Sequence, residues 1–515
     1  MKIRRVLVAN RSEIACRLIR GIQESGREAC TVFSDPDAAA LHVRLADRAW
    51  PLGGRTAQES YLDAEKIIAA ARALGCDAVH PGYGFLSERA EFNEQCRQAG
   101  LVFIGPTPEA QALMGVKTEA RAIAQKAGVP VSPGTAPLEA AEAVGAATRV
   151  GYPLLVKAAA GGGGKGMRRV LGPDELVEAV EGCRRDAVSS FGDGRVYLER
   201  IVERPRHVEI QVLGDAHGNV VSLGERECSV QRRHQKVIEE SPSVALDAAR
   251  RKAMSEAACA LARAVGYENA GTVEFLLDPS GKFYFLEMNT RLQVEHPVTE
   301  LVTGIDIVQA QLRIAEGEPL GIDQARIQPR GWAIEGRIYA EDPTRGFLPG
   351  AGTVEQWQEP GGPGVRVDAG VTRGSEVPVY YDPILAKLVV WAEDRERALA
   401  RFLSALDRFA VAGVPTTIPF LRLVARHASF REGDLATDFI DRALGGLDQV
   451  ARLCAETPTR DDALALAAAA LLGGAGSRRP FGGTAASPEA AQGEDALSPW
   501  RARDGWTLFK GALLE

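Results

Sequence analysis

The sequence predicts a mixed α/β and α+β protein, with an N-terminal Rossmann-like parallel sheet followed by two larger regions of mixed strands and helices. Three observations lead to this fold class. The chain has 515 residues, too many for one hydrophobic core, and its 45% hydrophobic and 25% charged residues are typical of globular proteins. Short apolar strands alternate with amphipathic helices over the first 110 residues. Farther along, pairs of strands flank turn or glycine signals, as in hairpins.

The alternating region opens with a strand at residue 5. Strands are predicted at 5–9, 29–33, 78–80 and 102–104, and helices at 13–24 and 61–74. This alternation indicates a parallel sheet covered on both faces. Such sheets often bind nucleotides, but Asn10-Arg-Ser-Glu13 follows the first strand where a dinucleotide site has Gly-x-Gly-x-x-Gly. The sequence therefore argues against a dinucleotide cofactor.

A glycine-rich segment follows a helix predicted at 114–130. The strand 152–157 ends in Lys157, a run of glycines occupies 161–166, and a basic strand is predicted at 167–170. Strand, glycine loop and strand describe a flexible hairpin flap, because glycines let the backbone bend and approach phosphates closely. A Walker A loop is excluded, since no Gly-Lys-Ser/Thr opens a helix here. A plain linker is the alternative interpretation of the glycine run.

The run from Phe283 to Glu295 concentrates the polar side chains that could bind a metal or take part in catalysis. Alternate residues of an extended strand share a face. That face holds Glu287, Asn289 and Arg291, and then Gln293 and Glu295 if the chain stays extended. The alternation therefore predicts a line of oxygen ligands, a guanidinium and a candidate base on one side of this strand.

A turn signal at 278–281 joins this run to an earlier strand, 272–277. A hairpin closed by this four-residue turn puts Glu274 opposite Phe285 and diagonal to Glu287. Glu274, Glu287 and Asn289 then converge as candidate metal ligands. Two carboxylates and an amide oxygen suit Mg²⁺, which takes few protein oxygens and leaves its other positions to water and phosphate. A strand whose polar face is merely solvated is the alternative.

Beyond the hairpin, a helix is predicted at 305–316. A mixed domain follows, with strands at 332–339 and 387–391 and a helix at 395–411. The character changes after residue 445: a helix is predicted at 461–472, a Gly/Ser/Ala/Pro-rich linker at 473–498, and a strand-like piece at 500–514. We expect this last piece to begin a further, truncated domain.

The bulk properties exclude several classes of protein. A net charge of −7 and a pI near 5.7 argue against a nucleic-acid partner. The eight cysteines show no CxxC spacing, which argues against a disulfide framework or a zinc site. The N-terminus has too short an apolar run for a signal peptide, and the longest uncharged stretch, 463–477, is too short to cross a membrane. We expect a soluble, cytoplasmic protein with no membrane partner.

Seven motifs together resemble one family. They are Ala9-Asn-Arg-Ser-Glu-Ile-Ala15, His80-Pro-Gly-Tyr-Gly-Phe-Leu-Ser-Glu88, Lys157 with Gly161 to Gly166, Pro205-Arg-His-Val-Glu-Ile-Gln211, Gln231-Arg-Arg-His-Gln-Lys236, Glu287-Met-Asn-Thr-Arg-Leu-Gln-Val-Glu-His-Pro297 and Glu335-Gly-Arg337. From about residue 3 to 445 the chain resembles the biotin carboxylase component of biotin-dependent acyl-CoA carboxylases, in the ATP-grasp superfamily. Two departures from the family pattern are Ser12 in place of a glycine and Gly336 in place of Cys or Ala.

The resemblance implies a domain plan. Residues 1–113 correspond to the N-terminal (pre-ATP-grasp) domain, 114–330 to the ATP-grasp domain with a flap subdomain at 131–203, 331–445 to the biotin carboxylase C-terminal domain, and 446–515 to a helix, a flexible linker and the start of the truncated domain. The tail looks like the start of the docking region in propionyl- or 3-methylcrotonyl-type α subunits.

The resemblance also implies the reaction, in which ATP, bicarbonate and biotin on a carrier give ADP, phosphate and carboxybiotin. The implied cofactors are ATP, Mg²⁺ (or Mn²⁺) and biotin as a carried substrate. No Ala-Met-Lys-Met motif occurs, so biotin is not expected on this chain. The implied partners are a biotin carboxyl carrier domain or protein, a carboxyltransferase subunit and a second copy in a possible homodimer. Another carboxylating ATP-grasp ligase and a non-catalytic assembly subunit are the alternative functions.

The matching motifs also imply which residues of this chain form the site. The ATP-binding set is Lys117, Lys157, Gly163, Gly164, Glu199, Arg200, Ile201, Val202, His207, Gln231, His234 and Leu276. The bicarbonate pocket is Lys236, Arg291, Gln293 and the backbone of Val294, and the metal ligands are Glu274, Glu287 and Asn289. Glu295 is the candidate general base, and Arg337 is expected to stabilise the ureido oxygen of biotin. The plain alternatives are Lys117 as a surface lysine, His207 as a strand histidine satisfied by local hydrogen bonds, and Arg337 as a structural partner of Glu335.

Overall fold

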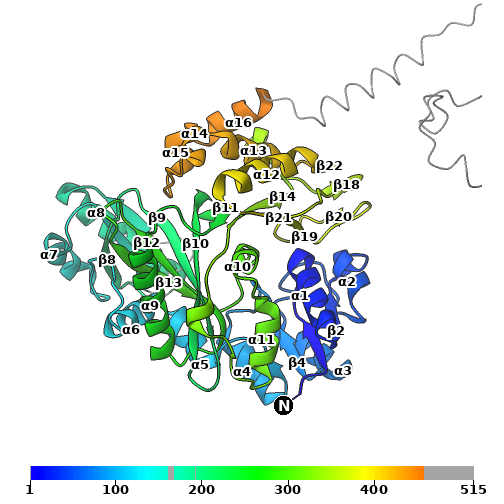
Figure 1. The fold of residues 1–515 in the computed structure, drawn as a ribbon. Coiled ribbons are helices and arrows are strands. Elements are labelled where there is room, and N and C mark those ends of the chain that lie inside the picture. The colour runs from blue at the N-terminus through cyan, green and yellow to red at the C-terminus, as the bar shows by residue number, and fades with distance from the viewer. Residues whose placement is uncertain (1, 160–166, 192, 457–515) are drawn as a thin grey trace, which may run out of the picture. The chain divides into compact units, whose positions relative to one another are not determined.

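The computed structural model describes residues 2–159, 167–191 and 193–456, all within one compact unit that extends from Met1 to Thr459 (Figure 1). Gly163 and Gly164 lie outside the described residues. So do the helix, linker and strand-like piece predicted between 461 and 514. In the part of the chain that is described, no helix is long and apolar enough to cross a membrane.

The N-terminal region is the predicted parallel sheet with helices on both faces. Its strand order is β3-β2-β1-β4-β5, with every pair parallel. The elements are β1 (Arg5–Val8), α1 (Ser12–Glu24), β2 (Glu28–Phe33), α2 (Leu41–Leu45), β3 (Arg48–Pro51), α3 (Ala64–Ala73), β4 (Ala78–His80), α4 (Ala90–Gln98) and β5 (Val102–Phe103). Val6, Leu7 and Val8 are fully buried, as expected of a strand covered on both faces. β3 is the strand that the sequence patterns missed.

A large antiparallel sheet fills the middle of the molecule. Its order is β13-β12-β9-β10-β11-β14-β21-β19. The strands are β9 (Arg206–Gly214), β10 (Val220–Arg232), β11 (Gln235–Ser241), β12 (Asn269–Leu277), β13 (Phe283–Asn289), β14 (Trp332–Tyr339), β19 (Val365–Ala369) and β21 (Ile384–Ala392). β11 pairs with β14, so the sheet continues without a break from the middle region of the chain into the region after residue 331.

The predicted flap is a small unit with a core of its own. β6 (Leu154–Ala158) pairs antiparallel with β7 (Met167–Val170), which confirms the predicted hairpin on either side of the glycine run. β8 (Val196–Arg200) completes this three-stranded sheet, and α7 (Ala140–Val150) and α8 (Pro173–Phe191) pack on it.

The remaining elements cover the large sheet. The helices are α5 (Pro108–Gly115), α6 (Lys117–Lys126), α9 (Ala248–Ala264), α10 (His296–Thr303), α11 (Ile307–Ala315), α12 (Arg395–Arg408), α13 (Ile418–Arg426), α14 (Ala428–Arg431), α15 (Phe439–Leu444) and α16 (Leu447–Glu456). The short strands are β15 (Glu341–Asp342), β16 (Leu348–Pro349), β17 (Gly352–Thr353), β18 (Gln356–Gln358), β20 (Glu376–Val377) and β22 (Ala410–Ala412).

Three predicted details of these elements are wrong. The helix expected at 114–130 is divided between α5 and α6 at Val116, where the backbone is extended. The helix expected at 395–411 ends at Arg408, because the chain then enters β22. Finally, β13 ends at Asn289, so the chain does not stay extended to Glu295; a loop follows, and α10 begins at His296.

The register of the β12–β13 hairpin also differs from the prediction. Phe275 pairs with Phe285, but Glu274 pairs directly with Glu287, because a bulge adds one residue to β13 between those two pairs. The bulge reverses the alternation, so that Phe285 packs in the core while Glu287 faces the same side as Glu274. The predicted diagonal placement of the two carboxylates is therefore wrong, and they stand opposite each other.

Candidate active site

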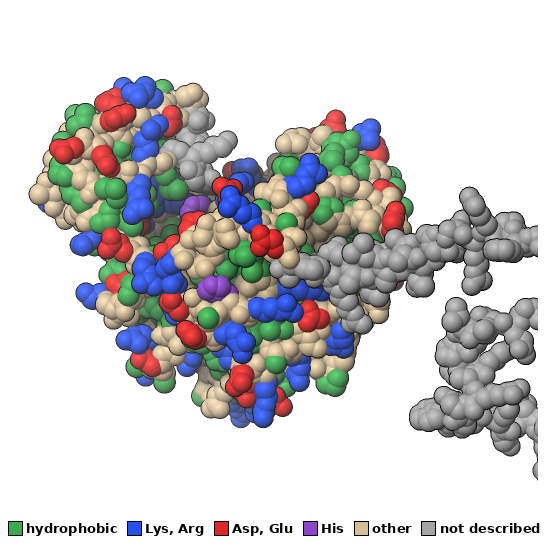
Figure 2. Space-filling view, turned by 90° about the horizontal axis from the view of Figure 1, so that it is seen from above, with side chains coloured by type: hydrophobic (Ala, Val, Ile, Leu, Met, Phe, Trp, Pro, Cys, Tyr) green, Lys and Arg blue, Asp and Glu red, His purple; other side chains and the backbone are tan. Residues whose placement is uncertain are grey.

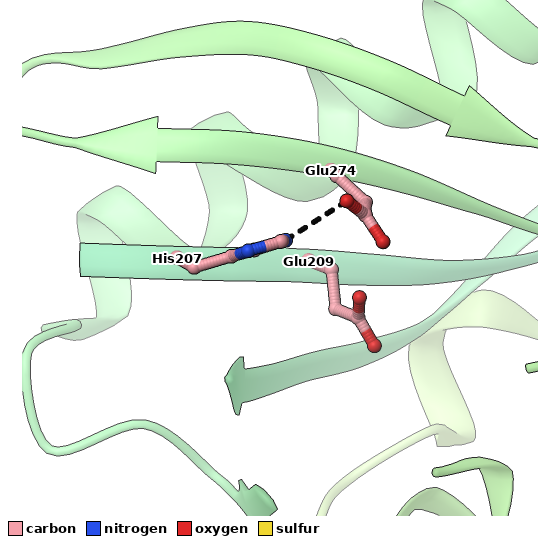
Figure 3. A group of neighbouring side chains, drawn as sticks. All are labelled: His207, Glu209 and Glu274. Carbon is pink, nitrogen blue, oxygen red and sulfur yellow. Dashed lines mark ion pairs between the residues drawn. The ribbon is translucent and has the colours of Figure 1, made fainter. Parts of the chain in front are cut away.

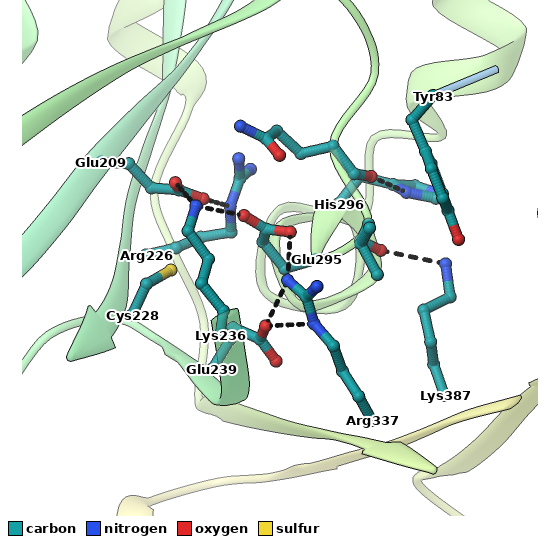
Figure 4. Close-up of polar contacts among 12 residues, drawn as sticks. Tyr83, Glu209, Arg226, Cys228, Lys236, Glu239, Glu295, His296, Arg337 and Lys387 are labelled. Atoms are coloured by element: carbon teal, nitrogen blue, oxygen red, sulfur yellow. Dashed lines mark hydrogen bonds and ion pairs between the residues drawn. The ribbon is translucent and has the colours of Figure 1, made fainter. Parts of the chain in front are cut away.

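Lys236 is the centre of a buried ionic cluster. Its ammonium lies 2.5 Å from Glu209, 2.7 Å from Glu274 and 2.7 Å from Glu295. Burial alone would lower the pKa of Lys236, but the three carboxylates hold that pKa well above its usual range. Strands β11, β9 and β12 and the loop before α10 each supply one member of the cluster. Figure 4 shows Lys236 with Glu209 and Glu295. A sheet of neighbouring antiparallel strands thus brings together residues that are far apart in sequence.

Glu295 is held between two cations. It occupies the N-cap position of α10 without capping the helix, and its side chain is fully buried. Lys236 contacts one carboxylate oxygen, and the Arg337 guanidinium contacts the other at 2.9 Å. Burial would raise the pKa of Glu295, but Lys236 and Arg337 keep it well below its ordinary value. The carboxylate is therefore ionised at neutral pH, as a proton acceptor must be.

Arg337 projects from β14 toward the same loop. Its Nε donates to Glu239 on the adjacent strand β11 at 2.6 Å, besides the contact with Glu295. Burial raises the pKa of Glu239 to about 7 even though Arg337 opposes this. Arg337 thus has two carboxylate partners, whereas both oxygens of Glu335 lack a hydrogen bond among the described residues. The alternative in which Arg337 pairs structurally with Glu335 is not what the structure shows.

Arg291 organises the loop that follows β13. Its Nε lies 3.0 Å from Glu88, the last residue of the His80-to-Glu88 motif. One of its terminal nitrogens donates to Gln293 at 3.2 Å and the other to Asn289 at 3.3 Å. The Gln293 amide in turn donates to Glu274 at 3.2 Å. Although the strand ends early, these contacts bring Arg291 and Gln293 to the ionic cluster.

The candidate metal ligands are oxygen donors on one face of the hairpin. Glu274 is buried, and Lys236 and His207 hold its pKa well below the ordinary value against the effect of burial. Asn289 donates its amide to Glu274 at 2.8 Å, and Glu287 lies 2.9 Å from the ammonium of Lys117. An ionised carboxylate, a second carboxylate directly opposite and an amide oxygen next to them fit Mg²⁺.

A second group of possible metal ligands overlaps this one. His207, Glu209 and Glu274 bring ligand atoms within 4.8 Å of one another, and His207 pairs with Glu274 at 3.0 Å (Figure 3). Glu274 raises the pKa of His207 against the effect of burial. The Lys236 ammonium contacts both Glu209 and Glu274 and therefore already supplies a positive charge at this point.

Three family models match the chain in succession. The biotin carboxylase N-terminal domain matches residues 2–111, the ATP-binding domain of the carbamoyl-phosphate synthase L chain matches 116–323, and the biotin carboxylase C-terminal domain matches 335–442. Biotin carboxylase of Nostoc sp. is 49% identical over 85% of this chain and 99% of its own length. The chain belongs to the biotin carboxylase family. It is an ATP-dependent ligase of the ATP-grasp type, as its sequence motifs indicate.

Longer relatives and solved structures agree with this family. The propionyl-CoA carboxylase alpha chain of Ruegeria pomeroyi is 49% identical over 85% of this chain and 67% of its own length. The mitochondrial methylcrotonoyl-CoA carboxylase subunit alpha of Dictyostelium discoideum is 45% identical over 98% of this chain and 70% of its own. The chain thus spans about two thirds of these alpha chains.

Two solved structures share the fold. The biotin carboxylase–β,γ-ATP complex of Campylobacter jejuni has a TM-score of 0.82 and 46% identity, covering 86% of this chain and 99% of that chain. The biotin carboxylase domain dimer of Hydrogenobacter thermophilus 2-oxoglutarate carboxylase, with MgADP and bicarbonate, has a TM-score of 0.82 and 44% identity, covering 86% of this chain and 98% of that chain.

The predicted nucleotide residues fall in two places. Lys157 on β6 contacts Glu199 on β8 at 2.5 Å, where β8 leads into the segment Arg200, Ile201 and Val202. On the large sheet, His207 lies beside Leu276, and the Gln231 amide nitrogen donates to His207 Nδ1 at 2.7 Å. His234 is exposed in the two-residue turn between β10 and β11.

The sequence patterns missed four charged residues that lie in or around the ionic cluster. Glu88, Glu209, Glu239 and Arg226 each contact a predicted site residue or its partner. Alternation could have found Glu209, since it lies two residues after His207 on the same face of β9. Glu239 carries no such signal, because only the pairing of β11 with β14 brings it to Arg337.

Proposed function

We propose that this chain carboxylates biotin on a carrier, using ATP and bicarbonate through carboxyphosphate, as the first half-reaction of an acyl-CoA carboxylase. The observation that carries the proposal is the ionised Glu295 held between Lys236 and Arg337. These two cations lie on the sheet that also bears Glu274 and Glu287. The proposed acyl-CoA class is propionyl- or 3-methylcrotonyl-CoA, on the similarity to alpha chains of those names.

Lys236, Arg291, Gln293 and the backbone of Val294 form the proposed bicarbonate pocket. A guanidinium donates two parallel hydrogen bonds to a planar, carboxylate-like anion, and a nearby ammonium adds charge. Arg291 and Gln293 are already hydrogen-bonded to each other, so the donors are held in place before the anion arrives.

Glu295 is the proposed general base for bicarbonate. It takes the proton as the bicarbonate oxygen attacks the γ-phosphate of ATP. The cations around Glu295 would make it a weak base in the free enzyme, because they stabilise its charge. A bound anion that shares Lys236 reduces this stabilisation, so the pKa of Glu295 rises when its substrate is in place.

Glu274, Glu287 and Asn289 are the proposed ligands of Mg²⁺, which when bound supplies charge neutralisation to the transferring phosphoryl group. Lys117, at the first turn of α6, is the proposed phosphate contact beside the metal, and its contact with Glu287 supports this role. Phosphoryl transfer depends on such positioning more than on covalent help from the protein.

The rest of the nucleotide set remains a proposal as predicted. Lys157 and the glycines at 163 and 164 are the proposed phosphate contacts, residues 199–202 the proposed adenine contacts, and His207, Gln231, His234 and Leu276 the remaining nucleotide contacts. Arg337 stabilises the negative ureido oxygen of biotin once its N1 proton has been removed, and phosphate released from carboxyphosphate takes that proton.

The proposed partners are a biotin carboxyl carrier domain or protein and a carboxyltransferase subunit, with a homodimer also proposed. Acidic and basic side chains are intermingled over the face shown in Figure 2, so this view offers no broad basic surface for nucleic acid. The domain boundaries near residues 113, 330 and 445 and the cytoplasmic location stay predictions.

ADP release tests the proposal. We expect turnover with ATP, Mg²⁺ and bicarbonate that free biotin stimulates and that Glu295→Ala abolishes. A rate of ADP release that is the same with and without biotin would instead assign the chain to another carboxylating ATP-grasp ligase. A wild-type chain that binds MgATP without turning over, alone or with a carrier, would identify a non-catalytic assembly subunit.

A further inference from the structure

Lys387 is a fully buried lysine beside the site, and it has no part in the chemistry proposed above. It lies on β21, and its ammonium donates to the backbone carbonyl of Val294 at 2.9 Å. It also lies 3.2 Å from Glu13 and 3.9 Å from Asp368. Figure 4 shows the ammonium directed at the loop that leads into α10.

The nearer carboxylate partner of Lys387 belongs to the N-terminal region. Glu13, on α1, is itself fully buried and accepts a hydrogen bond from the hydroxyl of Tyr83, which follows β4. α1, the segment after β4 and β21 are therefore linked through the Lys387 ammonium, which donates to the Val294 carbonyl. Burying an ammonium and a carboxylate costs several kcal/mol each unless their contacts compensate. An arrangement this demanding indicates that the carbonyl it reaches must be held still.

The register of the sheet explains which part of the loop is held. Lys387 stands directly opposite Arg337 in the β14–β21 pair. These neighbouring cations reach consecutive residues: Arg337 contacts the carboxylate of Glu295, and Lys387 contacts the carbonyl of the peptide that joins Val294 to Glu295. The preceding peptide is fixed separately, since the carbonyl of Gln293 contacts His296 Nδ1 at 2.7 Å.

These two peptides matter for different groups. The Gln293 carbonyl shares a peptide plane with the Val294 N–H, which is the proposed bicarbonate donor. The Val294 carbonyl shares its peptide plane with the backbone nitrogen of Glu295. The direction of this carbonyl therefore sets the position of the Glu295 backbone, from which the side chain of the base extends. Fixing both planes sets the distance between the bicarbonate donor and the base.

We propose that Lys387 is a positioning residue that holds the Val294–Glu295 peptide, so that the base and the bicarbonate donors keep their productive separation. This inference rests on the proposed bicarbonate pocket. Lys387 touches no substrate in this scheme; Glu13 balances its charge and ties the loop to the N-terminal region. A misplacement of about 1 Å in such a site costs about a hundredfold in rate.

Three variants separate positioning from charge balance. Lys387→Met removes the carbonyl contact and leaves Glu13 without its cation. Glu13→Gln keeps the Lys387–Val294 contact but removes the closer of the two ion pairs of Lys387, leaving the one with Asp368. The double variant removes both charges, which avoids an unpaired buried ion and should restore the thermal unfolding midpoint toward that of the wild type.

Biotin-dependent ADP release is measured at varied bicarbonate and varied ATP for each chain. We expect Lys387→Met and the double variant to raise KM for bicarbonate and lower kcat, with kcat/KM for bicarbonate reduced about ten- to a hundredfold. KM for ATP should stay within about twofold, and Glu13→Gln should keep KM for bicarbonate within about threefold of the wild type.

The outcomes that overturn the inference are specific. A double variant that folds normally and recovers wild-type kcat/KM for bicarbonate shows that Lys387 only neutralises Glu13. A loss that falls equally on ATP and bicarbonate shows a general structural role. Both results require an active wild type. If wild-type turnover ignores biotin, the proposed function fails first, and this inference fails with it.

Discussion

Replacing Lys236 with methionine removes the ammonium from between three buried carboxylates. In the wild type this ammonium lies 2.5 Å from Glu209 and 2.7 Å from each of Glu274 and Glu295. Methionine keeps much of the length and apolar volume of the side chain, so the change is mainly electrostatic. Breaking a buried pair by removing one partner costs about 3–5 kcal/mol, and we expect that loss in the free energy of unfolding at pH 8.

The pH dependence of this loss has a definite sign. In the wild type the pKa values of Glu274 and Glu295 are lowered, so their contribution to stability is present above the unfolded pKa and is lost as the pH falls through the folded values. Without Lys236, burial raises at least one of the carboxylate pKa values, so the folded variant keeps a proton that the unfolded chain has lost. The stability of the variant then falls as the pH rises.

The size of this effect follows from proton linkage. Each pH unit over which the folded variant holds one extra proton changes the free energy of unfolding by about 1.4 kcal/mol. Between pH 5.5 and 8 the variant should therefore lose about 3 kcal/mol relative to the wild type. At pH 5.5 the remaining cost should be about 1 kcal/mol, the value of a lost hydrogen bond.

Urea denaturation at pH 5.5 and 8 measures both quantities. Lys252→Met is the matched control, because Lys252 is an exposed lysine on α9, and it should change the free energy of unfolding by less than about 0.5 kcal/mol at either pH. The reasoning is refuted if Lys236→Met costs the same at both pH values, or costs more at pH 5.5.

Three further predictions concern single carboxylates. Glu295→Gln should lower kcat for ADP release about 10²–10⁴-fold, whereas Glu335→Gln, which mimics a carboxyl whose pKa burial already raises, should stay within about threefold. In the wild type, folded Glu239 keeps a proton between about pH 4.5 and 7 that the unfolded chain has lost, so the free energy of unfolding falls by up to about 3 kcal/mol across this range. Glu239→Gln should remove this fall, and denaturation at several pH values within the range measures it. Glu287→Gln should raise the Mg²⁺ concentration for half-maximal turnover about tenfold or more, and a Mg²⁺ titration checks this.

Each of these predictions has a contradicting result. Equal losses in Glu295→Gln and Glu335→Gln would show that any buried carboxylate here is needed for folding rather than for proton transfer. If the stability of Glu239→Gln depends on pH as that of the wild type does, a group other than Glu239 is responsible for the fall in stability. An unchanged Mg²⁺ requirement in Glu287→Gln would remove Glu287 from the metal site.

Local patterns were sufficient for much of the fold. The parallel N-terminal sheet, the hairpin around the glycine run and the strand at Trp332–Tyr339 were all predicted from periodicity and turn signals. The β12–β13 register was not, because the bulge inserts a single residue without any distinctive residue type to mark it. That bulge is what brings Glu274 directly opposite Glu287, so the arrangement of these candidate ligands differs from the predicted one.

The partners of the site residues were harder to predict than the residues themselves. Glu295 and Arg337 belong to recognisable motifs, whereas Glu239 and Lys387 become relevant only through pairing between strands that are distant in sequence. Burial adds to this difficulty, since a lysine on a strand gives no sign that its ammonium will be fully enclosed. Long-range register and burial are properties of the whole fold and leave little trace in a short window of sequence.

The unbroken eight-stranded sheet has a consequence for how the enzyme can move. Neighbouring strands lie about 4.8 Å apart, so the four strand-to-strand steps from β12 to β14 set a spacing of roughly 19 Å between the backbones that carry Glu274 and Arg337. Stretching that spacing would break whole ladders of hydrogen bonds. The sheet therefore keeps a fixed separation between Glu274, a proposed metal ligand, and Arg337, the proposed biotin contact. We expect any opening and closing for substrates to occur in the predicted flap, whose three strands form a separate sheet.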